Sequence, residues 1–246
     1  MKALKTLEII AASQAPVSVR DIAESLATDK ATSYRMLITL QKSGFVVRDD
    51  ATKLYSLSYK VVSLSRNLLA ENEVSKVILR ELRELAAITK ETLHYNVLDG
   101  RETVLVHRVK GSQLVNVEFQ VGDRSPLHCT SIGKAILAFQ DIRFIEEVIE
   151  AGLEKKAANT ISEPDKLREE LRKIRSQGYA IDDHEYSDNM RCIAVPVFEG
   201  GGRITSGISI SGPDSRFTLE KLEDLSHTLL SASRNLSKHL GGLPWH

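Results

Sequence analysis

The sequence is poor in the residues that a disulfide-stabilised or membrane-embedded protein needs. Only two of its 246 residues are cysteine, Cys129 and Cys192, which is too few for a disulfide framework and fits a reducing compartment. No apolar run approaches the roughly 20 residues that cross a bilayer, and no basic, apolar leader stands at the start. We therefore expect a cytoplasmic protein that does not contact a membrane.

The chain also lacks an excess of either charge, because 33 Lys and Arg residues balance 33 Asp and Glu residues. This balance argues against a protein coated with nucleic acid over its whole surface. The charges are unevenly distributed, however: residues 1–70 contain ten basic and six acidic residues, and the remainder contains 23 and 27. The basic first quarter indicates that only the N-terminal part contacts a polyanion. The length suits two globular domains.

Three short helical patterns and a hairpin pattern follow one another in the basic part. Residues 3–12 form the first amphipathic pattern, and Ser18 and Asp29 can each cap a further helix. Gly44 ends the third helix, and "FVVRDDATKLYSLS" contains two β-type runs around a polar turn. Helix, helix, tight turn, helix and hairpin is the layout of a winged helix-turn-helix, which we assign to residues 1–58.

The third helix and the hairpin supply the predicted contacts to double-stranded operator DNA. In this layout the start of the third helix enters the major groove, where its side chains reach base edges and phosphates. The alternative is a packing module of three helices whose charges are only solvated and in which Tyr34 belongs to the core. The basic excess and the hairpin favour DNA binding, and the predicted contacts are Lys30, Thr32, Ser33, Tyr34, Arg35, Arg48 and Lys53.

A helical pattern continues from Leu57 to about Thr89 and is interrupted near "LLAENEVS". We assign residues 59–72 to a linker helix. The pattern alone leaves open whether this helix joins two copies of the chain or packs within its own chain.

The remaining residues, 73–246, have the pattern of an α+β domain. Two strands surround the turn signal Asp99-Gly100, a third strand is predicted in "QLVNVEF", and a second hairpin joins "RCIAVPVF" to "RITSGISISG". Helices are predicted at about 133–150, 163–177 and 219–240; the second begins with Ser162-x-x-Asp165 and ends at Gly178. Helices set beside an antiparallel sheet give the α+β class.

The run "SPLHCTSIGKAIL" concentrates chemically active side chains in residues 125–137. A phosphate-binding loop is excluded, because only the Gly-Lys pair matches G-x-x-x-x-G-K-[ST]. His128 and Cys129 are neighbours and point to opposite sides of an extended segment, so a Cys nucleophile would need another histidine as its base. A metal would need ligands from afar, and no metal-ligand spacing unites the candidates, which are His128, Cys129, Asp182, Asp183, His184, Glu185 and Cys192.

The third interpretation of this run uses its backbone. If Thr130 or Ser131 caps a helix beginning near Gly133, the free N–H groups and positive dipole end suit a carboxylate. His128 and Cys129 would line or support that cradle, and Lys134 would be structural. We therefore expect the binding of a small organic anion, with no cofactor, no functional metal and no catalysis.

Several segments resemble the IclR-type bacterial transcriptional regulators, named after the isocitrate lyase regulator. The resemblance is carried by "PLHCTSIGKAILA", "NTISEPDKLREELRKIRSQGYAIDDHEY", "RCIAVPVF", "SGISISGPDSRFT" and the helix-turn-helix portion "VRDIAESLATDKATSYRMLITLQKSGFV". These segments agree with the family in order and spacing along almost the whole chain.

The resemblance implies a winged helix-turn-helix, a linker helix and a GAF-like effector-binding domain with an antiparallel sheet. It implies a homodimer or homotetramer whose operator binding changes with a small carboxylate or aromatic-acid effector. One departure is Asn189-Met190 where the family commonly has Gly-Val; Asn can adopt a left-handed backbone, and Met190 would narrow the pocket. With the cradle residues included, the predicted effector contacts are Leu114, His128, Cys129, Ser131, Ile132, Asp182, Cys192, Ser209 and Ser211.

Overall fold

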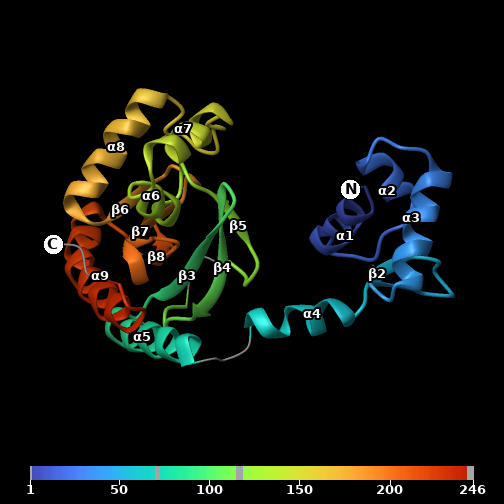
Figure 1. Cartoon of the computed structure of the whole chain (residues 1–246), viewed down its shortest axis with the longest axis horizontal. Coiled ribbons are helices and arrows are strands. Elements are labelled where there is room, and N and C mark those ends of the chain that lie inside the picture. Colours follow the sequence, from blue (N-terminus) through green and yellow to red (C-terminus); the bar gives the residue numbers. More distant parts are fainter. Residues whose placement is uncertain (1, 70–72, 115–118, 243–246) are drawn as a thin grey trace. The chain divides into compact units, whose positions relative to one another are not determined.

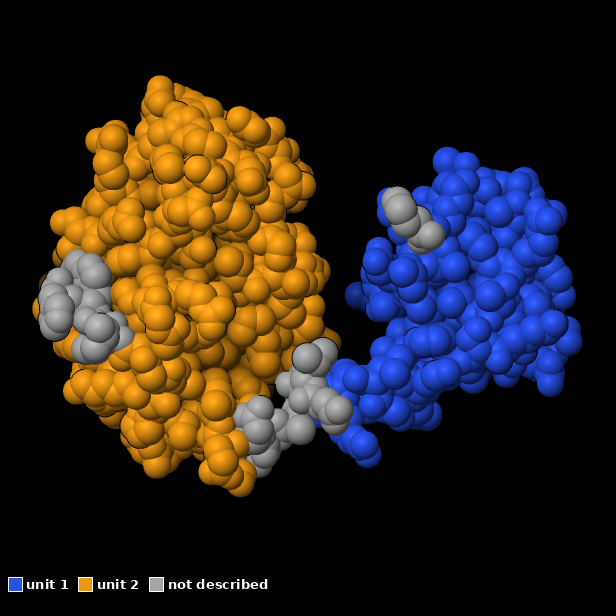
Figure 2. All heavy atoms as spheres, viewed as in Figure 1, with its two compact units in different colours: residues 1–70 blue, residues 71–246 orange. Residues whose placement is uncertain are grey.

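The computed structural model describes residues 2–69, 73–114 and 119–242. The chain divides into two compact units, residues 1–70 and 71–246, which Figure 2 colours separately. Within these described residues, one hydrophobic core lies in the first unit and two lie in the second.

Capping residues define the helices of the first unit. The Ser18 hydroxyl accepts a hydrogen bond from the Asp21 N–H (3.3 Å), and the Asp21 carboxylate accepts one from the Ser18 N–H (2.7 Å), which is a capping box. The Asp29 carboxylate accepts from the Thr32 N–H (2.8 Å) at the start of the next helix. The elements of this unit are α1 (Lys2–Ala12), α2 (Val19–Ser25), α3 (Lys30–Lys42), β1 (Val46–Arg48), β2 (Tyr55–Leu57) and α4 (Lys60–Leu69).

The three N-terminal helices and the hairpin share one core. The β1–β2 hairpin is antiparallel, and an isolated bridge between Val17 and Tyr55 adds a third short strand contact. The helices α1 and α3 pack against this hairpin and α2 packs against α3, so the N-terminal unit is the expected winged helix-turn-helix. The buried core residues are Ile10, Val17, Ile22, Leu37, Leu40, Val46 and Tyr55.

The second unit is built on a six-stranded antiparallel sheet with the strand order β5-β4-β3-β8-β7-β6. Figure 1 shows helices on both sides of this sheet, with α5 and α9 on one side and α6, α7 and α8 on the other. The elements are α5 (Glu73–Thr89), β3 (Thr92–Asp99), β4 (Glu102–Val109), β5 (Arg124–Pro126), α6 (Ser131–Leu137), α7 (Ile142–Glu150), α8 (Pro164–Gln177), β6 (Ala180–Asp183), β7 (Met190–Val197), β8 (Ser206–Pro213) and α9 (Leu219–His239).

The two faces of the central strands differ in chemistry because side chains alternate along a strand. The face that packs against α5 and α9 is apolar and contributes Leu93, Tyr95, Ile193, Val195, Ile208 and Ile210. The opposite face, which is turned toward α6, is polar or small and contributes His94, Asn96, Cys192, Ala194, Ser209 and Ser211. This polar face forms the floor of the candidate site.

The predicted α+β class is confirmed, and both predicted hairpins of the second unit are present. The helix expected at 133–150 is instead two helices, α6 and α7. The chain turns after Leu137, and the Asp141 carboxylate caps α7 by accepting from the Phe144 N–H (3.0 Å). None of the helices within the described residues is both long and apolar enough to cross a membrane.

Two other local predictions need correction. The N-cap residue of helix α8 is Glu163, which makes no side-chain hydrogen bond, so Ser162 does not cap the helix as predicted. Gly178 ends the helix as predicted, with φ of 84°. The strand predicted in "QLVNVEF" falls partly on residues 115–118, outside the described residues, and Gln113, Leu114 and Phe119 are not in a strand. The edge strand β5 pairs with β4 in its place.

Candidate functional site

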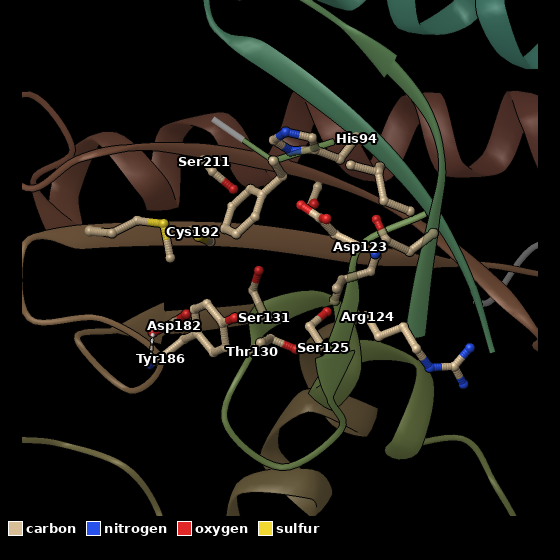
Figure 3. Close-up of a pocket in the computed structure, with 16 residues that line it drawn as sticks. His94, Asp123, Arg124, Ser125, Thr130, Ser131, Asp182, Tyr186, Cys192 and Ser211 are labelled. Atoms are coloured by element: carbon tan, nitrogen blue, oxygen red, sulfur yellow. Dashed lines mark hydrogen bonds between the residues drawn. The ribbon is translucent and has the colours of Figure 1, made fainter. Parts of the chain in front are cut away.

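A cavity of about 260 Å³ lies over the polar face of the sheet in the second unit. Figure 3 shows the side chains that surround it, which come from the central strands, the start of α6 and the loop after β6. The 16 described residues that line it are His94, Asn96, Leu105, Phe119, Asp123, Arg124, Ser125, Thr130, Ser131, Ile132, Asp182, Tyr186, Met190, Cys192, Ser209 and Ser211.

The strand register brings the floor residues together from distant parts of the chain. Asp182 pairs with Cys192, and Cys192 pairs with Ser211, so these three side chains form one row across β6, β7 and β8. His94 pairs with Ser209 in the next row. Together, these two rows present one carboxyl, one thiol, one imidazole and two hydroxyl groups to the same cavity.

The start of α6 forms a second wall. The Thr130 hydroxyl accepts from the Gly133 N–H (3.1 Å) and donates to the Pro126 carbonyl (2.8 Å), which confirms Thr130 as the helix cap. A Cβ on Gly133 would lie 2.6 Å from both Leu127 Cα and Pro126 O, so only glycine permits this close approach. The N–H groups of Ser131 and Ile132 belong to the first turn, where the helix supplies no acceptor.

Asp182 is the acidic group buried most deeply in the cavity wall. Its side chain is fully buried, and Oδ1 accepts from the backbone N–H groups of Glu185 (2.8 Å) and Tyr186 (3.3 Å). Its Oδ2 has no hydrogen-bond partner. Burial, and next the charge of Glu185, raise the pKa of Asp182 to about 7. Near neutral pH this carboxyl therefore exists both as an acid that donates and as an anion that accepts.

His94 lines the cavity at a distance from Asp182, as Figure 3 shows. The residue is only 3% exposed, and its Nε2 has no hydrogen-bond partner. Burial, and next the charge of Arg108, lower the pKa of His94 to about 4, so the imidazole is neutral at physiological pH. Phe119 packs edge-on against it, with ring centroids 5.6 Å apart.

Arg124 is the one residue among these 16 with a permanent positive charge, and that charge is already engaged. Its guanidinium donates to Asp99 (2.8 Å) and Glu102 (2.7 Å), and Figure 3 shows the side chain leaving the cavity. None of the 16 lining residues therefore offers a free cation to a ligand. A bound anion would depend on hydroxyl groups, backbone N–H groups and the protonated form of Asp182.

The structure brings six of the nine predicted effector contacts to the cavity: Ser131, Ile132, Asp182, Cys192, Ser209 and Ser211. The other three do not line it. Leu114 is fully exposed, and Cys129 is fully buried with a thiol pKa raised to about 12 by burial. The ring of His128 is also buried, and its Nε2 forms a hydrogen bond of 3.0 Å with the Glu154 carbonyl.

Reasoning from the sequence missed several lining residues, above all His94 and Asn96. The available signal was a polar residue at every second position of an otherwise apolar strand. Met190 does line the cavity. Asn189 does not use the left-handed backbone that asparagine tolerates; the residue with positive φ in this loop is His184, at 60°.

Six of the seven predicted DNA contacts are exposed or half-exposed in the first unit: Lys30, Thr32, Tyr34, Arg35, Arg48 and Lys53. Ser33 needs correction. It is fully buried, because it lies one turn before Leu37 on the face of α3 that packs into the core. Tyr34 is 46% exposed and is not a core residue. The Arg35 guanidinium donates to the Thr32 hydroxyl (3.2 Å), so these two side chains form one polar patch.

Among the described residues, the candidate metal ligands are not brought together. Within the part of the chain that the structure describes, no three or more His, Cys, Asp or Glu side chains are grouped so as to hold a metal ion. Both cysteines are buried and free, and burial raises the pKa of Cys192 well above its ordinary value. Buried thiols with raised pKa values are poor nucleophiles.

Comparisons with known proteins identify relatives of both units. Residues 1–50 match the model of the IclR helix-turn-helix domain, and residues 66–238 match that of the bacterial transcriptional regulator IclR C-terminal domain. The HTH-type transcriptional regulator KdgR of Escherichia coli (strain K12) is 33% identical over 92% of this chain and 86% of its own. The transcriptional repressor IclR of the same strain is 27% identical over 98% of this chain and 89% of its own. The crystal structure of the Thermotoga maritima IclR covers 98% of this chain and 97% of its own, with 33% identity and a TM-score of 0.75.

Proposed function

The chain belongs to the IclR family of bacterial transcriptional regulators, and on that premise we propose that it is an effector-responsive operator-binding protein. The resemblance recognised in the sequence is thereby confirmed. In this proposal residues 1–58 bind operator DNA, residues 59–72 link the domains, and residues 73–246 bind a small organic-acid effector. The effector binds two quaternary arrangements with different affinities and so shifts operator affinity by thermodynamic linkage.

The observation that carries the effector role is the polar cavity on one face of an otherwise apolar sheet. A sheet face covered by helices ordinarily buries apolar side chains, because buried polar groups without partners are costly. Here His94 and Asp182 are buried and each leaves one polar atom without a partner. A ligand that supplies those partners would offset the cost, which supports a binding site in this cavity.

A homo-oligomer is part of the proposal because helix α4 exposes apolar side chains. Tyr59, just before the helix, is 90% exposed, and Val62 and Leu64 are 64% and 60% exposed. A second copy of the chain would cover these residues. Two copies would also present two recognition helices to a two-fold symmetric operator.

The relatives are transcriptional regulators rather than enzymes, and the chemistry of the cavity supports a binding role for this chain. A thiol nucleophile requires a lowered pKa, whereas burial raises the pKa of both cysteines. A ligand would therefore meet polar groups that can hold it and no thiolate that would attack it.

Arg35→Ala is expected to weaken operator binding by about 1–3 kcal/mol if Arg35 contacts a base. The exposed guanidinium on the first turns of α3 would lose its contact to a guanine edge or a phosphate. Fluorescence anisotropy with labelled operator at fixed salt measures the change. Arg143→Ala, an exposed arginine on α7, serves as the matched control and should leave affinity unchanged. Equal affinities for the two variants would remove Arg35 from the interface.

Asp182→Ala and Ser209→Ala are expected to abolish the effector response without changing operator affinity. Both side chains lie in the cavity of the second unit, whereas DNA contacts are proposed only for the first. Operator affinity is measured with and without a panel of short carboxylates and aromatic acids. If both variants still respond to the compound that acts on the native protein, the effector site lies elsewhere.

A further inference from the structure

The recognition helix α3 and the linker helix α4 are joined by hydrogen bonds within the first unit. Three consecutive carbonyl groups follow α3, those of Ser43, Gly44 and Phe45. The Lys60 ammonium, at the start of α4, donates to Ser43 (2.7 Å). Ser58 donates twice, through its hydroxyl to Gly44 and through its N–H to Phe45 (2.9 Å). Carbonyl groups at a helix C-terminus lack partners within the helix, so these bonds complete the end of α3. We call these five residues the helix joint.

Lys60 contributes more than one contact to the helix joint. Its ammonium lies 4.7 Å from the centroid of the Phe45 ring, which is a cation–π contact. Its aliphatic stem covers Gly44, because a Cβ on that glycine would lie 3.5 Å from Lys60 Cδ. A cation at a helix C-terminus and a cation over an aromatic ring each favour the closed joint by a factor of roughly 2 to 5. Removing the Lys60 side chain should therefore open the joint roughly 4 to 25 times more often.

The helix joint connects the surface proposed for DNA to the surface proposed for a second copy. Helix α3 carries the predicted base contacts, whereas Tyr59, Val62 and Leu64 are exposed on or beside α4. If two copies associate through α4, the joint fixes the distance and the angle between their recognition helices. Each base pair added between two half-sites moves the second by about 3.4 Å and turns it by about 35° around the duplex. A closed joint therefore suits one half-site spacing.

We propose that Lys60 is a positioning residue for operator recognition, which restricts the protein to one spacing of the two half-sites. Lys60 acts through α3 and needs no contact with DNA. When the joint opens, α3 turns relative to α4, and a site of altered spacing is bound. The stability of the closed joint is thus a penalty on such sites, and weakening the joint lowers that penalty. This proposal rests on the proposed operator binding by a homo-oligomer.

A direct phosphate contact by Lys60 is the competing role, since the residue is exposed. Losing a phosphate contact weakens binding about equally at every spacing and lowers the slope of log affinity against log salt by about 1. Losing a positioning contact leaves the slope unchanged and reduces the difference in affinity between spacings. Spacing and salt dependence together therefore distinguish the two roles.

The test measures operator binding by full-length variants on duplexes of different spacing. The native chain first selects its operator from a random duplex pool, and the two half-sites are then moved closer or farther apart by one and two base pairs. The variants are Lys60→Ala, the conservative Lys60→Arg, and Lys5→Ala, which removes an exposed lysine from α1 of the same unit. Fluorescence anisotropy at several salt concentrations gives the affinity for each duplex.

We expect the native chain to prefer one spacing. The ratio of affinities for the preferred and the altered spacings should fall at least about threefold in Lys60→Ala and stay unchanged in Lys5→Ala. Lys60→Arg should restore the ratio, because a guanidinium also donates to a carbonyl and stacks on an aromatic ring. An unchanged ratio in Lys60→Ala would overturn the proposal. So would an equal loss of affinity at every spacing with a reduced salt slope.

Hydrogen exchange of the Ser58 amide measures the helix joint itself in the absence of DNA. The Phe45 carbonyl holds this N–H, so it exchanges when the joint opens. We expect exchange roughly 4 to 25 times faster in Lys60→Ala and unchanged in Lys5→Ala. Faster exchange with an unchanged spacing ratio would end the positioning role and leave operator binding standing. A native chain that selects no paired half-sites would refute operator binding by a homo-oligomer, and the positioning role with it.

Discussion

Lys134→Ala is expected to lower the free energy of unfolding of the second unit by about 3–5 kcal/mol. The Lys134 side chain is fully buried on α6, where its ammonium pairs with Glu185 and, at 3.3 Å, with Glu170. Removing the ammonium would leave the carboxylate of Glu185, which is 8% exposed, without its partner. The large cost arises from this stranded charge, because the pair itself contributes little beyond offsetting its own desolvation.

Urea denaturation measures the loss, and two comparisons identify its cause. Lys156→Ala breaks the ion pair with Glu154 (2.7 Å), whose side chains are 33% and 73% exposed, and should cost less than about 1 kcal/mol. The double variant Lys134→Met with Glu185→Leu removes both charges and should recover most of the stability. If Lys134→Ala proves no less stable than Lys156→Ala, the buried pair is not what joins α6 to the loop after β6.

The features predicted from the residues alone, without the family resemblance, are local ones. The caps at Ser18, Asp29 and Thr130 need only an acceptor side chain and a free N–H two or three residues further on. The turn at Gly100 needs only positive φ, which is 62° in the structure. Lys134 was also assigned correctly as structural, although its two glutamate partners lie far along the chain and could not be named.

The features that were missed depend on contacts between distant segments. His94 became part of the site only when β3 paired with β8 and placed it beside Ser209. Ser33 was assigned to DNA because it lies near the start of the third helix, yet the core of the first unit extends to that position. His128 and Cys129 were expected to line or support the cradle because they precede Thr130, but the bend at residues 127–130 buries both side chains away from the cavity.

Effector binding is expected to weaken roughly tenfold for each pH unit above 7, because Asp182 must carry a proton to donate to a carboxylate. The pKa of Asp182 is about 7 in the free protein, mainly through burial. A bound carboxylate is a like charge and raises that pKa further. The complex therefore keeps a proton that the free protein releases. The affinity for the effector is highest below pH 7 and decreases as the pH rises from 7 to the pKa of Asp182 in the complex.

Calorimetry at pH 6, 7 and 8, in buffers with different ionisation enthalpies, measures both the affinity and the proton taken up on binding. Asp182→Asn should flatten the pH profile, because a neutral amide donates at every pH. Asp123→Asn is the matched control, since Asp123 also lines the cavity but is exposed and accepts from the Gln120 N–H (2.7 Å). That variant should keep the native profile. Affinity that is constant or rises toward pH 8 in the native protein would mean that Asp182 binds as an anion. That result would remove the protonated Asp182 carboxyl from carboxylate binding.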